Sequence, residues 1–260
     1  MSRIETQNEI IEEESRIGVM THVIVGYPTM QATEDLVITM AENGADFIEL
    51  QIPFSDPVAD GPTILKASQI ALDNGTTVDD AFQLAQNLRK KGVTIPLLFM
   101  TYANIVHATG IEKFVEQSAK VGIDGFIIPD LPFDTKEGKE MFSLAQKHSL
   151  EMIPLYAPTM KKDRYEALGN YAQNIIYAVS RTGVTGVKGT NSETDLDKYL
   201  DTIKKTTSAK TKIALGFGIQ SHAQIENLKN TVDTVVIGSH LVRTFDEKGN
   251  EGVANFLQKI

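Results

Sequence analysis

Residues 47–62 have the sequence FIELQIPFSDPVADGP, which joins a buried strand to an acidic loop. The run from Phe47 to Ile52 has the aliphatic and aromatic character of a strand, although it contains Glu49. The residues that follow are rich in proline and aspartate, which end a strand and form a loop. The stretch therefore places one carboxylate inside an apolar strand and two more, Asp56 and Asp60, on the loop after it.

Similar apolar runs recur along the whole chain. Segments with a helical period, such as residues 33–46 and 79–92, separate them. Continuous apolar runs are typical of a parallel sheet that is covered on both faces. We therefore expect the α/β class and one (β/α)8 TIM barrel over residues 1–260, with an extra N-terminal helix. A doubly wound open sheet is the alternative, but no GxGxxG turn follows the first run. The runs begin at residues 21, 47, 96, 125, 151, 174, 212 and 234.

Composition and charge exclude several classes of protein. The net charge of −9 argues against a nucleic-acid-binding protein, which would need clustered Lys and Arg. No apolar stretch approaches the roughly 18 residues of a membrane span. The polar, acidic first residues do not have the pattern of a signal peptide, so we expect a cytoplasmic protein. Cysteine is absent, which excludes disulfides and thiolate chemistry.

Glycines follow the last two predicted strands. In a TIM barrel the C-terminal ends of the strands form the mouth, where the chemistry takes place. Gly216 and Gly218 follow the seventh strand and Gly238 follows the eighth, each at the expected start of a helix. Backbone N–H groups at such positions form a phosphate cradle, although turn glycines without a ligand are the alternative. A glycine- and threonine-rich loop at residues 181–191 has the composition of a mobile lid, or of a flexible surface loop.

The two carboxylates around the second strand suggest acid–base chemistry. Burial of a carboxyl group raises its pKa toward values useful for proton transfer, whereas one in a polar loop stays ionised. Such a pair can divide the acid and base roles, and we expect Glu49 and Asp60 to do so. A structural ion pair is the alternative for Glu49, but no predicted strand offers an obvious interior Lys or Arg. For Asp56 we expect a helix cap or a partner contact.

Other reaction types fit the sequence less well. A Schiff-base aldolase needs a lysine inside the barrel, and Lys212 is the only strand lysine and lies at an entry end. A metal-dependent aldolase needs clustered His and carboxylate side chains, whereas the five histidines are scattered along the chain. The sequence therefore favours acid–base chemistry without a metal or a cofactor, on a substrate that carries a phosphate group.

The segment ELQIPFSDPVADGPTI, residues 49–64, resembles the ELGIPFSDPxADGP motif of tryptophan synthase α subunits. The resemblance covers essentially the whole chain and includes further motifs in the same order. These motifs are TYAN at 101–104, PDLP at 129–132, SRTGVTG at 180–186, GFGI at 216–219 and GS at 238–239. It implies a carbon–carbon lyase of tryptophan biosynthesis, which cleaves indole-3-glycerol phosphate to indole and glyceraldehyde 3-phosphate.

The resemblance also implies roles for individual residues. Glu49 matches the general acid–base that protonates the released indole carbon, and Asp60 matches the carboxylate that holds the indole N–H. Tyr177 matches a supporting hydroxyl beside that catalytic pair. The resemblance implies no metal site. The positions it implies for substrate binding are His22, Ile64, Met100, Tyr102, Thr185, Gly186, Phe217, Gly218, Gly238 and Ser239.

Family members dock on a β subunit, so the resemblance implies this partner in an α2β2 heterotetramer, with pyridoxal phosphate in the β subunit and no cofactor in this chain. Three residues depart from the usual pattern. Gln51 replaces a glycine, His22 replaces an aromatic residue, and Tyr27 replaces an aspartate, which leaves Thr29 as the expected cap of the next helix. Two alternatives stay open: another phosphate-binding barrel enzyme, such as a phosphosugar isomerase or epimerase, and a non-catalytic regulatory subunit.

Overall fold

The apolar runs form the strands of one parallel sheet in the computed structural model, which describes residues 1–179, 193–216 and 218–260. Every strand pairing within these residues is parallel, as the continuous apolar runs predict. The strands are β1 (Gly18–Ile24), β2 (Phe47–Gln51), β3 (Leu97–Met100), β4 (Gly125–Ile127), β5 (Glu151–Met152), β6 (Leu155–Tyr156), β7 (Ile175–Val179), β8 (Lys212–Gly216) and β9 (Thr234–Ile237).

The fifth predicted strand, residues 151–156, is divided into β5 and β6. Pro154 lies between them and has no N–H to donate to a neighbouring strand. Ile153 donates to Phe126 of β4 at 2.9 Å, and the Pro154 carbonyl accepts from Tyr177 of β7 at 3.0 Å. The first half of the segment therefore pairs with β4 and the second half with β7. This switch of partner joins the two ends of the sheet order β5-β4-β3-β2-β1-β9-β8-β7-β6 and confirms the predicted barrel.

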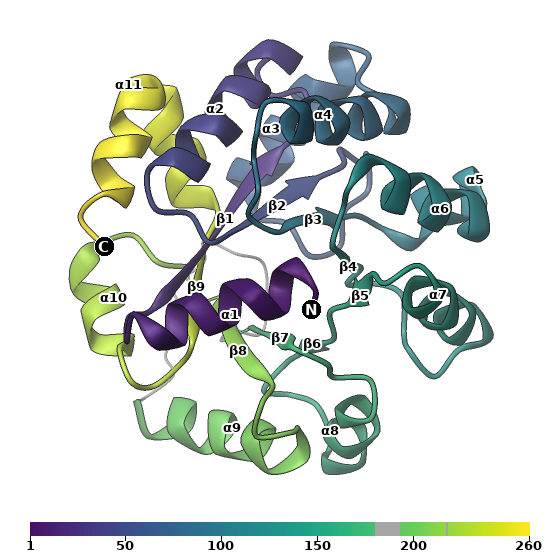
Figure 1. Ribbon diagram of the computed structural model, residues 1–260, viewed down its shortest axis with the longest axis vertical. Coiled ribbons are helices and arrows are strands. Elements are labelled where there is room, and N and C mark those ends of the chain that lie inside the picture. The colour runs from purple at the N-terminus through teal and green to yellow at the C-terminus, as the bar shows by residue number, and fades with distance from the viewer. Residues whose placement is uncertain (180–192, 217) are drawn as a thin grey trace.

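Helices surround the strands on the outside of the barrel (Figure 1). Side chains at helix starts explain where some of them begin: Thr29 caps α2, as expected, and Thr77 forms a capping box with Asp80 at α4. The described helices are α1 (Arg3–Glu13), α2 (Met30–Glu42), α3 (Pro62–Asp73), α4 (Val78–Lys90), α5 (Ala103–Thr109), α6 (Ile111–Val121), α7 (Lys136–Lys147), α8 (Lys162–Gly169), α9 (Glu193–Thr206), α10 (His222–Leu228) and α11 (Ser239–Leu257).

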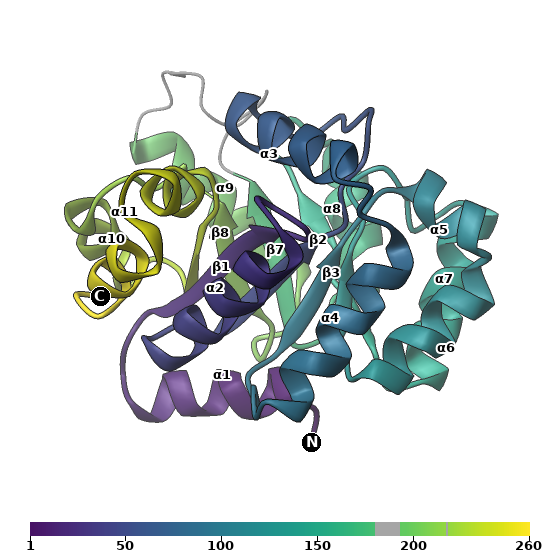
Figure 2. The ribbon, with the colours of Figure 1, turned by 90° about the horizontal axis from the view of Figure 1, so that it is seen from above.

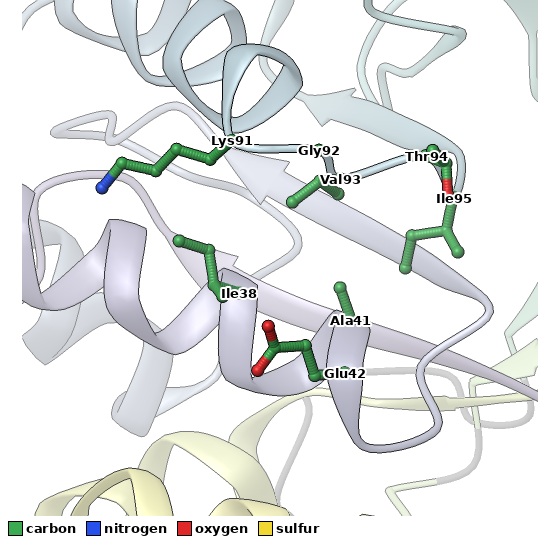
Figure 3. A pocket seen from close by; sticks show the side chains of 8 residues that line it. All are labelled: Ile38, Ala41, Glu42, Lys91, Gly92, Val93, Thr94 and Ile95. Atoms are coloured by element: carbon green, nitrogen blue, oxygen red, sulfur yellow. The ribbon is translucent and has the colours of Figure 1, made fainter.

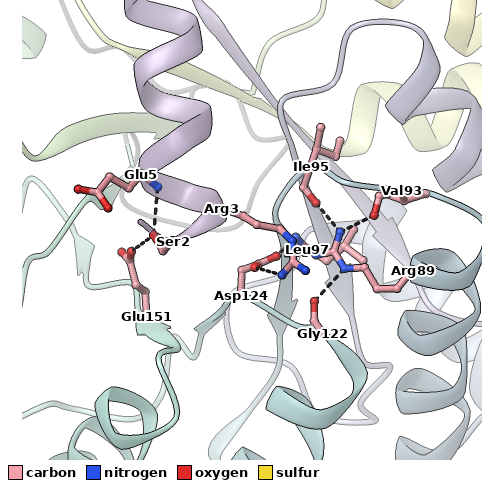
Figure 4. Close-up of polar contacts among 10 residues, drawn as sticks. All are labelled: Ser2, Arg3, Glu5, Arg89, Val93, Ile95, Leu97, Gly122, Asp124 and Glu151. Carbon is pink, nitrogen blue, oxygen red and sulfur yellow. Dashed lines mark hydrogen bonds and ion pairs between the residues drawn. The ribbon is translucent and has the colours of Figure 1, made fainter.

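Helix α1 is the predicted extra helix, and it lies across the end of the barrel where the strands begin (Figures 1 and 2). Its Ile4 and Ile11 are buried against the barrel interior, together with Met20 and Phe47 from the strands. Polar contacts fix the helix in place, because Arg3 and Arg89 both pair with Asp124, at 2.9 and 2.6 Å (Figure 4). This end of the barrel is therefore closed, and the opposite end remains for a ligand.

Candidate active site

Strand β2 directs alternate side chains into the barrel. Phe47 belongs to the interior cluster of apolar side chains, so Glu49 and Gln51, two and four residues further along, face the same side. Both are buried, and Glu49 is only 2% exposed. The predicted inward position of Glu49 is thus present, and Gln51 also points into the barrel toward its C-terminal end.

Glu49 forms a hydrogen bond with His22 from the neighbouring strand. The register of β1 and β2 places these two residues side by side, and the His22 Nδ1 lies 2.8 Å from the Glu49 Oε2. His22 is 8% exposed. Burial alone would lower the pKa of His22, but the negative charges of Glu49 and Asp60 and the hydrogen bond to Glu49 raise it above its ordinary value.

Asp60 folds back from the loop onto the same end of β2. The Gln51 Nε2 donates to the Asp60 Oδ2 at 2.6 Å, and Asp60 is 8% exposed. The sequence placed Asp60 in a more polar environment than Glu49, whereas the structure buries both side chains. Burial raises the pKa of Asp60, and this effect exceeds the opposing effects of His22, Gln51 and Tyr102.

Tyr177 brings a phenol to the same place from β7. It is partly buried, and burial together with the charges of Glu49 and Asp60 raises its pKa well above the ordinary value. The phenol therefore stays protonated and can donate a hydrogen bond. Gly216 on the adjacent β8 makes room for the ring, since a Cβ there would lie 2.9 Å from the Tyr177 hydroxyl.

Several buried polar atoms at this end of the barrel have no hydrogen-bond partner among the described residues. A buried polar atom without a partner costs about 1–3 kcal/mol, so a group of them indicates a ligand or ordered water. The Gln51 amide lies near the His22 ring and favours its charged form, but no hydrogen bond of ordinary geometry joins them. The buried atoms without a partner are the Glu49 Oε1, the His22 Nε2, the Gln51 Oε1, the Thr101 Oγ1 and the Tyr102 hydroxyl. The Tyr102 hydroxyl lies near Asp60 and lowers its pKa, but no hydrogen bond of ordinary geometry joins them.

Apolar side chains surround the polar group. Met100 at the end of β3 belongs to the interior cluster, and Tyr102 stacks on Phe54 with their ring centroids 5.3 Å apart. Ile64 of α3 lies in a separate small cluster with Ile24 and Val242. An aromatic ligand with one polar edge would match the interior surface around Glu49.

The last strand leads directly into a helix, as predicted. Gly238 precedes α11, and Leu241 and Val242 donate back to the Gly238 carbonyl at 2.9 and 3.2 Å. The N–H groups before this first turn, including that of Ser239, have no acceptor within the helix. They are available to an anion together with the positive end of the helix dipole.

The glycine loop after β8 differs from the prediction. Helix α10 begins at His222, so Gly218 precedes it by four residues and does not open it. Gly218 has a φ of 64°, a conformation that favours glycine, and its Cα faces open space. It can still offer its N–H to a ligand. Three other predicted site residues, Thr185, Gly186 and Phe217, lie outside the described residues.

Elsewhere, the described part of the chain offers weaker candidates. A hollow between α2 and the segment before β3 is lined by Ile38, Ala41, Glu42 and residues 91–95 (Figure 3). Its lining residues 91–95 come just before β3, so the hollow lies away from the C-terminal ends of the strands. No three His, Asp or Glu side chains among residues 1–179, 193–216 and 218–260 lie together as metal ligands would. None of the described helices is both long and apolar enough to cross a membrane.

Sequence reasoning did not predict the partners of the two carboxylates. It identified Gln51 only as a departure from a motif and left open where Gln51 points, and it gave His22 as a departure at a substrate-binding position. The buried Gln51 amide donates a hydrogen bond to Asp60, and the His22 ring forms a hydrogen bond with Glu49. A signal was present for His22, since both His22 and Glu49 are polar residues inside apolar strands that neighbour each other along the chain.

Comparisons with known proteins agree with this geometry. Residues 9–259 match the family described as "Tryptophan synthase alpha chain". A tryptophan synthase alpha chain from Desulfotalea psychrophila is 40% identical over 258 residues, covering 98% of this chain and 99% of that one. Another, from Syntrophotalea carbinolica, is 40% identical over 94% of each chain. A solved structure of Mycobacterium tuberculosis tryptophan synthase superposes with a TM-score of 0.90 at 28% identity, covering 99% of this chain and 96% of that one.

Proposed function

This chain belongs to the tryptophan synthase alpha chain family, a family of lyases in tryptophan synthesis, and we propose that Glu49 and Asp60 carry out its reaction. The substrate is indole-3-glycerol phosphate, which is cleaved to indole and glyceraldehyde 3-phosphate. The observation that carries the proposal is the pair of buried carboxylates at the mouth of an apolar barrel. Within the described residues, neither of them forms an ion pair with a lysine or arginine.

Cleavage begins with a proton transfer to carbon. Protonated Glu49 gives its proton to the ring carbon that carries the glycerol chain, and positive charge develops on the ring nitrogen. The Asp60 carboxylate accepts a hydrogen bond from the ring N–H and stabilises this charge, which is worth more in a dry site than in water. The Glu49 Oε1, which has no partner among the described residues, is the oxygen that faces the reacting carbon.

The carbon–carbon bond breaks in the second step. The Glu49 carboxylate takes the proton of the adjacent substrate hydroxyl, and the bonding electrons return to the ring to restore indole. One proton enters the substrate and one leaves it, so Glu49 ends the cycle protonated as it began. The Tyr177 phenol lies close enough to both carboxylates to feel their charge and supplies a hydrogen bond beside them.

The phosphate group binds at the start of α11. Gly238 and Ser239 offer backbone N–H groups and the helix dipole, and Gly218 adds a further N–H donor. Gly186, outside the described residues, is the remaining phosphate position that the resemblance implies. Met100, Phe217, Ile64 and Tyr102 contact the ring and the chain of the substrate. Thr185, outside the described residues, is the position to which the resemblance assigns the ordering of Asp60. The net charge of −9 repels an anion, so the protein needs local N–H donors and a helix dipole to bind the phosphate group.

A β subunit is the proposed partner, in an α2β2 assembly, with pyridoxal phosphate bound by the β subunit and no cofactor in this chain. The loop between β2 and α3 supports this contact. Val58 is 75% exposed at its tip, beside the exposed Ser55 and Asp56, while Asp60 two residues later is buried in the site. A partner seated on residues 55–59 would therefore press on the segment that positions Asp60.

Release of glyceraldehyde 3-phosphate from indole-3-glycerol phosphate tests the function. The purified chain should turn over slowly, and Glu49→Gln should abolish turnover. A phosphosugar isomerase would not be stabilised against heat by indole-propanol phosphate, whereas this lyase should be. Absence of turnover, with or without a β subunit, would favour a non-catalytic regulatory subunit instead.

A further inference from the structure

A buried imidazole next to the proposed acid is the feature that the reaction above leaves unused. His22 projects from β1 into the barrel at the level of Glu49, because the β1–β2 register pairs the two residues. Gly238 at the end of the neighbouring β9 packs against the base of the ring, since a Cβ at that glycine would lie 3.6 Å from the His22 Cβ. The ring is therefore held between β2 and the start of α11.

One proton must lie between these two side chains. The His22 Nδ1 and the Glu49 Oε2 are 2.8 Å apart and almost fully buried, so two bare acceptors would repel each other. Either the imidazole N–H donates to the carboxylate, or the carboxylic acid donates to the imidazole. In both forms Oε2 is occupied, while the Glu49 Oε1 has no partner among the described residues.

The charges around the ring favour one further proton on the pair, beyond the N–H that a neutral imidazole alone would donate to the carboxylate. Glu49 on β2 and Asp60 on the following loop are the charged groups that act on His22, and both are acidic. The other neighbours are uncharged at neutral pH: the Gln51 amide on β2, the Tyr177 phenol on β7 and the backbone of Gly238. Among the described residues, no cationic side chain competes with His22 for Glu49.

We propose that His22 is a positioning residue for Glu49: it holds Oε2, leaves Oε1 for the substrate carbon, and shares one proton with the carboxyl group. This proposal rests on the proposed function, since it needs Glu49 to be the acid. The active form is neutral His22 with protonated Glu49, and it exchanges with the form in which His22 carries the proton. Glu49 gives its proton to carbon and recovers one from the substrate hydroxyl, so His22 keeps its hydrogen bond throughout.

A shared proton has a measurable consequence for the pH dependence. The proton belongs to the pair, which loses it at a higher pH than a carboxyl group alone would. The alkaline decline of kcat/KM should therefore lie at higher pH in the natural chain than in His22→Gln, by roughly one pH unit. Glutamine can still donate to Oε2 but cannot carry the proton.

Three variants test the proposal through the rate of glyceraldehyde 3-phosphate release between about pH 6 and pH 10. His22→Phe, which keeps an aromatic ring but no donor, should lower kcat about tenfold, and His22→Gln should lower it less. Both should move the alkaline decline to lower pH. His107→Gln is the matched control, because His107 is an exposed imidazole on α5, and it should leave the profile unchanged.

A titration of His22 by NMR checks the pair without relying on activity or on a His22 variant. Glu49 raises the pKa of His22, so Glu49→Gln should lower it. An unchanged His22 pKa, or an alkaline decline at the same pH in all variants, would overturn the proposal. So would His22 variants as inactive as Glu49→Gln. If the natural chain shows no turnover that depends on Glu49, the proposed function itself fails, and the NMR titration still reports on the pair.

Discussion

Buried carboxylates at the two ends of the barrel differ in the partners that surround them. At the closed end, under α1, Asp124 pairs with Arg3 and Arg89 and also accepts from the Leu97 N–H at 2.8 Å (Figure 4). Asp46 at the same end pairs with Arg16 at 2.6 Å and accepts from the Val19 N–H. At the mouth, Glu49 and Asp60 are just as buried. Among the described residues each of them has a hydrogen bond to one side chain, and neither pairs with a lysine or arginine.

The difference in partners indicates that the carboxylates at the closed end stabilise the fold, whereas those at the mouth serve the reaction. A carboxylate with two guanidinium partners and a backbone donor has its hydrogen-bonding capacity filled by the protein, so it can fix the position of a helix and a strand. Glu49 keeps one oxygen without a partner among the described residues, and a buried oxygen without a hydrogen bond destabilises a folded protein. Changes at the two ends should therefore affect different measurements.

The largest expected effect is at the mouth. Glu49→Gln should lower kcat for cleavage of indole-3-glycerol phosphate by at least about 10³-fold, because an amide cannot transfer the proton. The free energy of unfolding should change little, since the amide oxygen can still accept a hydrogen bond from His22. Steady-state kinetics and urea unfolding on the same preparation measure both. A large loss of stability with normal turnover per folded molecule would show that Glu49 serves stability and not catalysis.

Substitution of a carboxylate at the closed end should instead lower the free energy of unfolding and leave kcat nearly unchanged. Asp124→Ala leaves the Arg89 side chain, which is only 14% exposed, without its carboxylate partner, and it also removes the acceptor for the Leu97 N–H. Breaking a buried ion pair in this way costs about 3–5 kcal/mol. Urea unfolding should show this loss, whereas kcat of the remaining folded protein should stay within about twofold. Glu166→Ala, at an exposed pair with Lys162, is the matched control and should barely change the unfolding midpoint.

Much of the fold could be predicted from the sequence because its signals are local. Continuous apolar runs indicated buried parallel strands, and Ile4, Ile10 and Ile11 among acidic residues indicated an extra helix. In the structure Ile4 and Ile11 are buried and Ile10 is 38% exposed. The division of residues 151–156 was missed because Pro154 sits in an otherwise apolar run. Its effect depends on which strand lies on each side, and this is a property of the closed barrel and not of the segment.

The site was less predictable because its contacts join distant parts of the chain. The position of Glu49 follows from the alternation along β2, and the pattern alone provides it. The bond between Gln51 and Asp60 requires the loop to fold back over the strand end, and the bond between His22 and Glu49 depends on the stagger of β1 against β2. Neither the fold of the loop nor the stagger can be deduced from apolar spacing, so the sequence did not predict that Asp60 is as buried as the residues of the strand end.

The amide of Gln51 should set the acid side of the pH profile. Gln51 lowers the pKa of Asp60 against the larger effect of burial, so Gln51→Met, which removes the amide at similar volume, should raise that pKa further. Asp60 must be ionised to stabilise the charged ring, so the acid decline of kcat/KM should move to higher pH, and kcat should fall by about tenfold. An unmoved acid decline, equal to that of the exposed control Gln83→Met, would mean that Gln51 does not act on Asp60.

The smallest expected effect is at the edge of the closed end, where Ser2 caps α1. Its hydroxyl accepts from the Glu5 N–H at 3.1 Å and lies 3.3 Å from the Glu151 Oε1, so it links the helix start to β5 (Figure 4). Ser2→Ala removes one cap and should cost about 1 kcal/mol. Because Ile4, two residues later, is fully buried against the barrel interior, this loss should appear as faster amide exchange in the first turn of α1 before any global unfolding. The lyase activity should be unchanged, since α1 closes the end of the barrel that the substrate does not enter. A fall in kcat for Ser2→Ala would show that the closed end is coupled to the mouth, and the separation of stability from function would then not hold.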